Sequence, residues 1–292
     1  MTTSHPPAEP EVSVIIPVYN CLSYTRECLR TLEETIGNHS YEILIIDDGS
    51  TDGSRDYLAT LPTNRYRIFL NEKNQGYAAN NNRGAREARG KYLLLLNNDT
   101  VLRPGWFEPL WNLWQLDPSA GGVGNVQINP RTGLIDHAGI FFDYRGVPHH
   151  VRKNRGRLPK EEYTRWNAVT ACCFMIPRDV FLSMDGFDEE YRNGSEDVDL
   201  CIRLRLAGYP LYVANRSIIH HFVSTSPGRL DHAVANSEKV LRRWQEVTTQ
   251  WGQKEWPAQY FRRYARHWWK ITPGRFFRAL YYLLRHALLR KQ

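Results

Sequence analysis

The first hundred residues alternate short apolar runs with segments whose apolar residues recur at helical spacing. Three runs, residues 12–17, 41–46 and 91–96, are almost continuously apolar, which is typical of strands buried on both faces of a parallel sheet. Residues 66–70 predict a shorter strand, and residues 76–89 predict a helix with small packing residues. Strands that alternate with helices predict βαβ units, and therefore an α/β fold.

Polar loops follow the predicted strands, at residues 18–20, 47–50, 74–76 and 97–99. In open parallel sheets, ligands bind outside the carboxyl ends of the strands. The Asp-Asp-Gly-Ser loop alone is more often a turn with a helix cap. Four such loops at one edge of a sheet predict a binding site. A nicotinamide dinucleotide site is excluded, because no G-x-G-x-x-G follows the first strand.

From about residue 121 the apolar runs become shorter, and glycine and proline become more frequent. Residues 169–177 predict another buried strand, residues 179–184 a short helix, and residues 218–219 the end of a strand. The basic segment at residues 145–160 has few apolar residues and predicts a mobile loop. The second half therefore predicts a less regular structure than the first.

Three carboxylates crowd the stretch Ser195-Glu196-Asp197-Val198-Asp199, where a helix is expected to begin. A serine followed by acidic residues stabilises the first turn of a helix, so a capped helix is one interpretation. The other is that one carboxylate stands at a pocket as a general base. Asp199 lies about 200° around the helix from Asp197, so the two cannot share a direction. We expect Asp199 to pair with Arg203, four residues further on.

Composition places limits on the class of protein. The chain has 292 residues, enough for one large α/β domain or two small ones. Its five cysteines include no C-x-x-C pair, which favours a reducing compartment such as the cytoplasm. The polar, proline-containing first ten residues have no apolar core of a secretory signal, and no run reaches about 20 apolar residues.

The net charge of +7 comes from the C-terminal end of the chain. Residues 256–292 contain nine lysines and arginines and no acidic residue, which leaves 29 basic and 31 acidic residues elsewhere. Apolar residues 276, 280, 283, 284, 287 and 288 recur at helical spacing, with arginines 275, 278 and 285 on the opposite face. This pattern predicts a helix at an anionic membrane surface. Packing on the domain and a dimer contact remain alternatives. Nucleic-acid binding is disfavoured, because no recognised module accompanies the charge.

Several motifs occur together in a specific order. The first half contains residues 12–20, 45–54, 74–84 and Asn97-Asn98-Asp99, and the second half contains Gly186-Phe187-Asp188-Glu189, Glu196-Asp197-Val198-Asp199 and His220-His221. In order and spacing they resemble the landmarks of family 2 glycosyltransferases with the GT-A fold. Within that family the sequence is most similar to bacterial rhamnosyltransferase-like enzymes of cell-surface polysaccharide assembly. The resemblance covers roughly residues 12–250.

The resemblance implies a GT-A (Rossmann-like) α/β fold, with a mostly parallel central sheet flanked by helices. Residues 12–120 would bind a nucleotide sugar, and residues 121–250 would form the acceptor-binding half of the same domain. Residues 251–292 would form a basic, aromatic helical extension, and residues 1–11 would be disordered.

The resemblance also assigns residues to the donor. Asp48 matches the position that binds a pyrimidine base, which suits a dTDP- or UDP-linked sugar, with rhamnose as one candidate. The other positions expected near the nucleoside, ribose and diphosphate are Pro17, Val18, Tyr19, Gly76, Asn82, Asn98 and Asp99.

The Asn97-Asn98-Asp99 loop stands where the family has its D-x-D motif, which holds a divalent cation against the diphosphate. Hard oxygen ligands and phosphate suit Mg²⁺ or Mn²⁺. Asn97 replaces the first aspartate, so Asp99 is the only carboxylate of the loop. A histidine completes the metal shell in some relatives, and we favour His221 over His220 for that position.

The family inverts configuration by a single displacement, in which a carboxylate removes the proton of the acceptor hydroxyl. Asp197 matches that base, and Glu196 is expected to contact the acceptor or orient the site. Thr170-Ala171 stands where Thr-Gly is common, which predicts a slightly altered pocket wall. The acceptor would be a glycan or a lipid-linked glycan at the inner face of the cytoplasmic membrane, and oligomers are possible.

A nucleotide-sugar-binding protein that has lost catalysis is the alternative interpretation. Asn97 is the only feature that favours it, whereas the intact Glu196-Asp197 pair speaks against it.

Overall fold

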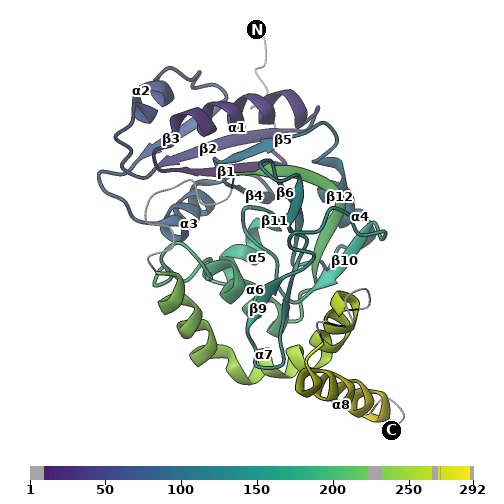
Figure 1. Ribbon diagram of the computed structural model, residues 1–292. Helices are drawn as coiled ribbons and strands as arrows, with labels where there is room; N and C mark the ends of the chain where they lie inside the picture. The colour runs from purple at the N-terminus through teal and green to yellow at the C-terminus, as the bar shows by residue number, and fades with distance from the viewer. Residues whose placement is uncertain (1–9, 223–231, 265–268, 270, 290–292) are drawn as a thin grey trace.

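The computed structural model describes residues 10–222, 232–264, 269 and 271–289 (Figure 1). The predicted alternation of strands and helices in the first hundred residues is confirmed. The elements are β1 (Val12–Val18), α1 (Leu22–Thr35), β2 (Tyr41–Asp47), α2 (Ser54–Ala59), β3 (Tyr66–Leu70), α3 (Tyr77–Glu87) and β4 (Tyr92–Leu96). The predicted disorder of residues 1–11 lies largely outside the described residues, although Glu11 N donates to Ser40 O at 2.9 Å.

Most strands of the second half are short, as its frequent glycine and proline residues predict, but the two longest described strands, of eight and eleven residues, also lie there. Its elements are β5 (Thr100–Leu102), α4 (Glu108–Leu116), β6 (Gly122–Asn129), β7 (Leu134–His137), β8 (Ile140–Phe142), β9 (Pro148–His150), β10 (Tyr163–Trp166), β11 (Cys173–Pro177), α5 (Arg178–Ser183), α6 (Glu196–Leu206) and β12 (Leu211–His221). Two predictions are corrected. The strand expected at residues 169–177 begins only at Cys173, and the segment expected as a loop at 145–160 contains β9, which pairs with β8.

The central sheet has the strand order β10-β12-β6-β11-β4-β1-β2-β3, with β5 beside β12 and β7 beside β6. Pairing is parallel within β4-β1-β2-β3 and between β6 and β12. The pairs that β11 makes with β4 and β6 are antiparallel, so the sheet as a whole is mixed. The parallel part brings the carboxyl ends of β1, β2 and β4 to one edge, as the strand-end loops predict.

Apolar side chains cover both faces of this sheet. Val12, Val14 and Ile16 face a core with α1 and α4, whereas Ile15 and Leu44 face a second core with α3, α5 and α6. In Figure 1, α1 lies on one side of the sheet and α3 on the other. Because both faces of the sheet are buried, these strands have continuous apolar sequences rather than an alternation of apolar and polar residues.

Two C-terminal helices, α7 (Ala233–Tyr264) and α8 (Pro273–Leu289), extend beneath the sheet (Figure 1). The hairpin of β8 and β9 packs closely on α7, since a Cβ added at Gly252 would lie 1.8 Å from the carbonyl oxygen of Asp143. On α8, Phe276 and Ala279 pack with Tyr260 of α7. The helical extension is therefore confirmed, and part of it packs on the domain.

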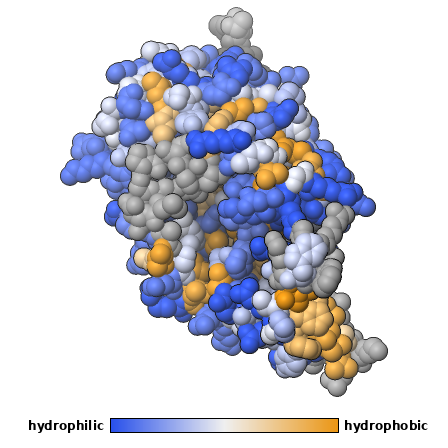
Figure 2. Space-filling model, viewed as in Figure 1, coloured by the Kyte–Doolittle hydropathy of each residue, from blue (hydrophilic) through white to orange (hydrophobic). Residues whose placement is uncertain are grey.

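The apolar side chains of α8 do not form the single face that the sequence pattern predicts. Phe276 and Ala279 point inward, whereas an outer row, Phe277, Tyr281, Leu284 and Leu288, is exposed by 53–69%. Figure 2 shows hydrophobic surface gathered over this end of the molecule. Residues 265–268, 270 and 290–292 of the predicted tail lie outside the described residues.

Candidate active site

A pocket of about 530 Å³ lies at the carboxyl ends of β1, β2 and β4. It brings together nine of the residues singled out from the sequence: Pro17, Val18, Tyr19, Asp48, Gly76, Asn98, Asp99, Glu196 and Asp197. Asn82 and His221 are outside its lining. Residues as far apart in the chain as Pro17 and Asp197 thus meet at one edge of the sheet.

Asp48 holds the loop that follows β3. Its buried carboxylate accepts hydrogen bonds from the backbone N–H groups of Gln75 and Gly76, at 2.7 and 3.0 Å, and from Asn71 Nδ2 at 3.0 Å. Gly76 has a φ of +92°, a backbone conformation that residues other than glycine rarely adopt. The Asp48 carboxylate, which also lines the pocket, therefore fixes a second stretch of the pocket wall.

The side-chain amide of Asn82 links α3 to the segment that follows α5. Its amide donates to Phe187 O at 2.8 Å and to Glu189 Oε1 at 2.9 Å, and its Oδ1 accepts from Phe187 N at 2.8 Å. Gly186 has a φ of +64°, and a Cβ there would lie 2.3 Å from Asn82 Oδ1. This amide therefore joins α3 to the Gly186-Phe187 motif, away from the pocket.

Asp99 and His221 are neighbours at the end of β12. His221 Nε2 lies 3.3 Å from Asp99 Oδ1, and both side chains are buried. Neither ring nitrogen of His221 has a well-directed hydrogen bond to the described residues. A buried imidazole that faces a carboxylate in this way fits a metal ligand. His220 instead lies beside Arg103, and burial together with that guanidinium lowers its pKa.

The amide of Asn98 is turned toward α1, where it donates to Thr25 Oγ1 at 2.9 Å. The described residues contain no cluster of three or more His, Cys, Asp or Glu side chains that could hold a metal alone. Asp99 and His221 would supply two ligands, so a cation there would need further oxygens from a bound ligand such as a diphosphate.

Asp197 stands in the first turn of α6 and lines the pocket. Its Oδ2 accepts from Ala171 N at 3.2 Å, and its Oδ1 accepts from Val198 N at 2.8 Å. Tyr77 OH in turn donates to Ala171 O at 2.9 Å. Burial raises the pKa of Tyr77 well above its usual range, as do the nearby Cys172, Glu196 and Asp197. The tyrosine therefore stays protonated and can keep donating.

The start of α6 differs in one respect from a helix capped by serine. Ser195 has a φ of +74°, and its side chain makes no capping hydrogen bond. Glu196 is 6% exposed, and its Oε2 accepts from Gly194 N at 2.6 Å. The Glu196 carboxylate, rather than the serine hydroxyl, therefore fixes the turn that leads into the helix.

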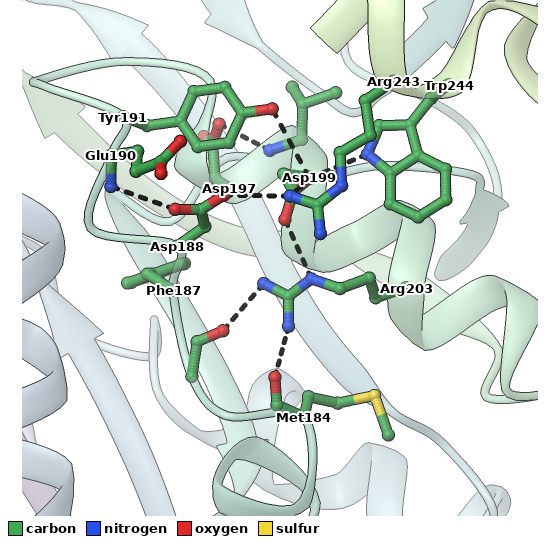
Figure 3. Close-up of polar contacts among 12 residues, drawn as sticks. Met184, Phe187, Asp188, Glu190, Tyr191, Asp197, Asp199, Arg203, Arg243 and Trp244 are labelled. Atoms are coloured by element: carbon green, nitrogen blue, oxygen red, sulfur yellow. Dashed lines mark hydrogen bonds and ion pairs between the residues drawn. The ribbon is translucent and has the colours of Figure 1, made fainter. Parts of the chain in front are cut away.

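Asp199 is fully buried, and the predicted pair with Arg203 is confirmed at 2.8 Å. The Asp199 carboxylate also accepts from Trp244 Nε1 at 2.7 Å, and Arg243 lies 3.4 Å away (Figure 3). Arg203 continues to the carbonyl oxygens of Met184 and Gly186. Asp199 therefore joins α6, α7 and the Gly186-Phe187 motif, and it is absent from the pocket lining.

Sequence reasoning missed His149 and His150, which line the pocket from the β8–β9 hairpin. His150 Nδ1 lies 2.9 Å from Nδ1 of the buried His137. Burial, and secondarily the neighbouring His150, lower the pKa of His137 well below its usual range, so it is neutral. The available signal was the Val147-Pro148-His149-His150 run, but without a known strand pairing it indicates only a turn.

The family model described as "Glycosyl transferase family 2" matches residues 13–183. The chain belongs to this family. The match covers the pocket-lining loops after β1, β2, β3 and β4, whereas Glu196 and Asp197 lie beyond it. The expected fold class and the family resemblance are therefore confirmed, whereas the individual site residues remain predictions.

Curated relatives of this family 2 glycosyltransferase include proteins of polysaccharide synthesis. It is 31% identical over 225 residues to "O-antigen biosynthesis protein RfbC" of Myxococcus xanthus, over 73% of this chain. It is 38% identical over 246 residues to "Chondroitin synthase" of Escherichia coli, over 80% of this chain. The matches cover only 17% and 32% of those relatives' own lengths.

The fold is similar to that of a solved glycosyltransferase, "GalNAc-T7 with UDP, GalNAc and Mn2+". The two structures superpose with a TM-score of 0.65 at 20% sequence identity, over 87% of this chain and 52% of the other. At that identity the likeness supports the GT-A fold alone. None of the helices in the described ranges is long and apolar enough to span a bilayer.

Proposed function

We propose that this family 2 glycosyltransferase moves a sugar from a nucleoside diphosphate sugar to a hydroxyl of a surface-polysaccharide glycan, with inversion. One observation carries the proposal: Asp48, Asp99 and Asp197 come from three distant segments and line one pocket of about 530 Å³. A pocket of that volume is in the usual range for a cofactor-sized ligand. Two of its carboxylates, Asp48 and Asp99, lie near the strand ends. The other two, Glu196 and Asp197, lie at the start of α6.

The donor would lie across the loops after β1, β2 and β4. Pro17, Val18 and Tyr19 would contact the nucleoside, and Asp48 would accept from the N–H of a pyrimidine base. UDP and dTDP both carry such a group. Because the Asp48 carboxylate already orders the backbone at Gly76, base recognition and the wall beside the ribose would be coupled.

A divalent cation would be held by Asp99 and His221, with the donor's diphosphate completing its shell. The buried, sparsely bonded imidazole beside the carboxylate supports this assignment. Mg²⁺ or Mn²⁺, when bound, would stabilise the negative charge of the departing diphosphate. Asn97, whose Oδ1 is buried without a hydrogen-bond partner among the described residues, would be a neutral neighbour.

Asp197 would be the general base for the acceptor hydroxyl. Two backbone N–H groups hold its carboxylate, and one comes from Ala171, which Tyr77 anchors. The carboxylate is therefore oriented before an acceptor arrives, which is what a general base requires. Single displacement needs no second carboxylate as nucleophile, so Glu196 is left to support the turn at Gly194.

The decisive experiment is a thermal-shift screen of nucleotide sugars with and without Mn²⁺, followed by turnover assays with the ligand that stabilises most. Preferential binding to the folded state raises the melting temperature, so the true donor should stand out. We expect a UDP- or dTDP-linked sugar, rhamnose among them, to stabilise the protein and be consumed. Stabilisation without turnover, with water or any glycan acceptor, would favour the catalytically impaired binding protein instead.

We further propose that α8 attaches the enzyme to an anionic membrane surface. Its outer row, Phe277, Tyr281, Leu284 and Leu288, is exposed, and Arg285 lies beside that row at helical spacing, whereas the Arg278 guanidinium lies 4.6 Å from the centroid of the Tyr144 ring. Amphipathic helices with flanking arginines bind anionic interfaces. A second copy of the chain that met this row through its own α8 would bring the same positive charge, because residues 256–292 contain no acidic residue.

Co-sedimentation with vesicles containing phosphatidylglycerol tests this attachment. Replacing Phe277, Leu284 and Leu288 by serine should release the protein, since each exposed side chain loses apolar contact with lipid. The matched control replaces Leu116 and Leu206, which are exposed by 66% and 52% elsewhere on the surface. Equal binding by the triple variant and the wild type would refute membrane attachment through α8.

A further inference from the structure

A pair of histidines connects the buried interior of the second half with the main pocket. His137, on β7, is fully buried, whereas His150, on β9, lines the pocket. Their Nδ1 atoms lie 2.9 Å apart, and their rings are almost perpendicular, at 83°. Two ring nitrogens at that distance form a hydrogen bond only if one of them carries a hydrogen and the other offers a lone pair.

The backbone at Gly139 decides which nitrogen carries the hydrogen. Gly139 N donates to His137 Nε2 at 3.1 Å, so this nitrogen offers a lone pair. Burial lowers the pKa of His137 well below its usual range, which agrees with a neutral ring. A neutral imidazole then has its hydrogen on the other nitrogen, so His137 Nδ1–H donates to His150 Nδ1.

The lone pair at His150 Nδ1 fixes the second tautomer in turn. The hydrogen of a neutral His150 is on Nε2, which points away from His137. The hairpin backbone holds this arrangement, since Gly139 O accepts from Val151 N at 2.8 Å. Ile140 of β8 also pairs with His150 of β9. His150 therefore presents an N–H donor of fixed tautomer on the pocket wall.

The histidine pair belongs to the wall of the pocket that carries the proposed base. Thr170 N lies 3.5 Å from His137 Nε2. The next residue, Ala171, donates from its backbone N to Asp197 Oδ2 at 3.2 Å. Two consecutive residues thus contact the histidine pair and the base. Asp48, on the other wall, is bonded to the loop after β3 instead.

We propose that His150 Nε2–H donates a hydrogen bond to an oxygen of the acceptor sugar, and that His137 is the positioning residue that fixes the donor tautomer. The proposal rests on the proposed function and adds a residue that recognises the acceptor. An acceptor sugar has further oxygens beside the hydroxyl that attacks. Because His137 engages the lone pair of His150, His150 orients the acceptor but does not remove its proton, which leaves that step to Asp197.

The first measurement is an NMR spectrum of the full chain labelled with ¹⁵N-histidine, at about pH 8, where an unperturbed histidine is neutral. The chemical shifts of the two ring nitrogens report which one carries the hydrogen. We expect it on Nε2 of His150 and on Nδ1 of His137, with each signal assigned by its loss in a variant. A hydrogen on His150 Nδ1, or a mixture of tautomers, would overturn the proposal.

Three variants separate the donor from its support. His150→Gln keeps an N–H near the place of Nε2, whereas His150→Asn keeps only a hydrogen-bond acceptor near the place of Nδ1. His137→Gln keeps an acceptor for Gly139 N but removes the hydrogen that His150 receives, so the His150 tautomers should mix. If His137→Gln does not fold, the wild type and the His150 variants still decide. His39→Asn is the control, because His39 precedes β2, away from the carboxyl ends of the strands.

A panel of methyl glycosides supplies the acceptor probes. The His150 signal should shift when a glycoside binds, and UDP with Mn²⁺ should leave it in place. In steady-state transfer, His150→Asn should raise the KM for the glycoside by about fivefold or more, as loss of one hydrogen bond predicts, with the donor KM unchanged. His150→Gln should recover most of that loss, and His39→Asn should match wild type.

Two outcomes would place His150 outside acceptor recognition. One is a raised donor KM or a shift caused by UDP, which would assign the residue to the donor. The other is no shift with any glycoside, or transfer by His150→Asn equal to that of wild type. If no nucleotide sugar is consumed, the transferase proposal fails, and the His150 signal still decides whether this residue contacts a glycoside. If the donor is consumed and His150→Asn transfers normally, only the inference about His150 fails.

Discussion

The two walls of the main pocket are built in different ways. One wall consists of loops that directly follow strands of the parallel sheet, and the register of the sheet aligns them: Asp48 N donates to Val18 O at 2.7 Å. The other wall joins α6, the residues after Thr170 and the β8–β9 hairpin, through single contacts such as Ala171 N to Asp197. Regular sheet geometry therefore places the proposed donor residues, whereas individual long-range hydrogen bonds place the proposed base.

The comparison predicts that the two walls can be disabled separately, and the largest effect is expected at Asp197. Asp197→Asn keeps the size of the side chain but removes the base, so transfer should fall by about 10²–10⁴-fold. Binding of the nucleotide should stay close to that of wild type, because the other wall is untouched. Steady-state rates and a nucleotide titration check both parts, and near-normal turnover would sink the assignment.

Asp199 lies on the same helix as Asp197, but we expect its loss to affect stability rather than catalysis. Asp199→Ala should lower the free energy of unfolding by roughly 3–5 kcal/mol, because Arg203 is left without its buried partner. Asp188→Ala is the matched control, since Asp188 pairs with Arg243 but is 23% exposed and should cost far less. Urea denaturation of both variants measures the difference. Equal costs would show that burial of Asp199 does not matter.

The donor wall can be tested through its proposed metal ligands. His221→Ala should raise the Mn²⁺ concentration needed for nucleotide binding by at least about tenfold. His220→Ala provides the neighbouring control, because His220 faces Arg103 instead of Asp99. Titrating Mn²⁺ at fixed UDP separates the two variants. An identical requirement for Mn²⁺ in both would remove His221 from the metal site.

The smallest effect concerns the contact that supports the hairpin wall. Glu255 on α7 accepts from Phe142 N at 3.2 Å and from Asn167 Nδ2 at 2.8 Å, and burial raises its pKa to about 7. A raised folded-state pKa gives stability that is present below about pH 4.5 and is lost as the pH rises through 7.

The melting temperature of the wild type should therefore fall more between pH 5 and 8 than that of Glu255→Gln, by roughly a few degrees. The neutral His137 contributes with the opposite sign in both proteins and cancels from the difference. Glu246→Gln, at an exposed position of the same helix, should behave like wild type. Parallel curves for the wild type and Glu255→Gln would contradict the raised pKa.

The contrast between the walls also explains what the sequence could predict. The loops around Asp48 and Asp99 follow apolar strands, so their shared position at one sheet edge follows from chain order. The pair of Asp199 and Arg203 follows from helical spacing. The hairpin carrying His149 and His150 depends on the pairing of β8 with β9 and on α7, and no local pattern encodes such a contact.

The start of α6 and the outer row of α8 show a second structural feature that local sequence patterns do not predict. The sequence predicts a serine cap, but the positive φ of Ser195 turns its side chain out of capping geometry. On α8 the apolar residues divide between an inner face and an exposed row, because only part of the helix meets α7. Periodicity predicts that a helix is amphipathic, but the packed partner decides which side is buried.

A crystal structure with Mn²⁺ and UDP or dTDP, whichever stabilises the protein more, tests the central claim most directly. We expect the base to lie against Asp48 and the cation to lie between Asp99, His221 and the diphosphate. The side of the pocket next to Asp197 should stay open for an acceptor. A nucleotide lying against Asp197, or a diphosphate remote from Asp99, would contradict the division of the pocket into a donor wall and an acceptor wall.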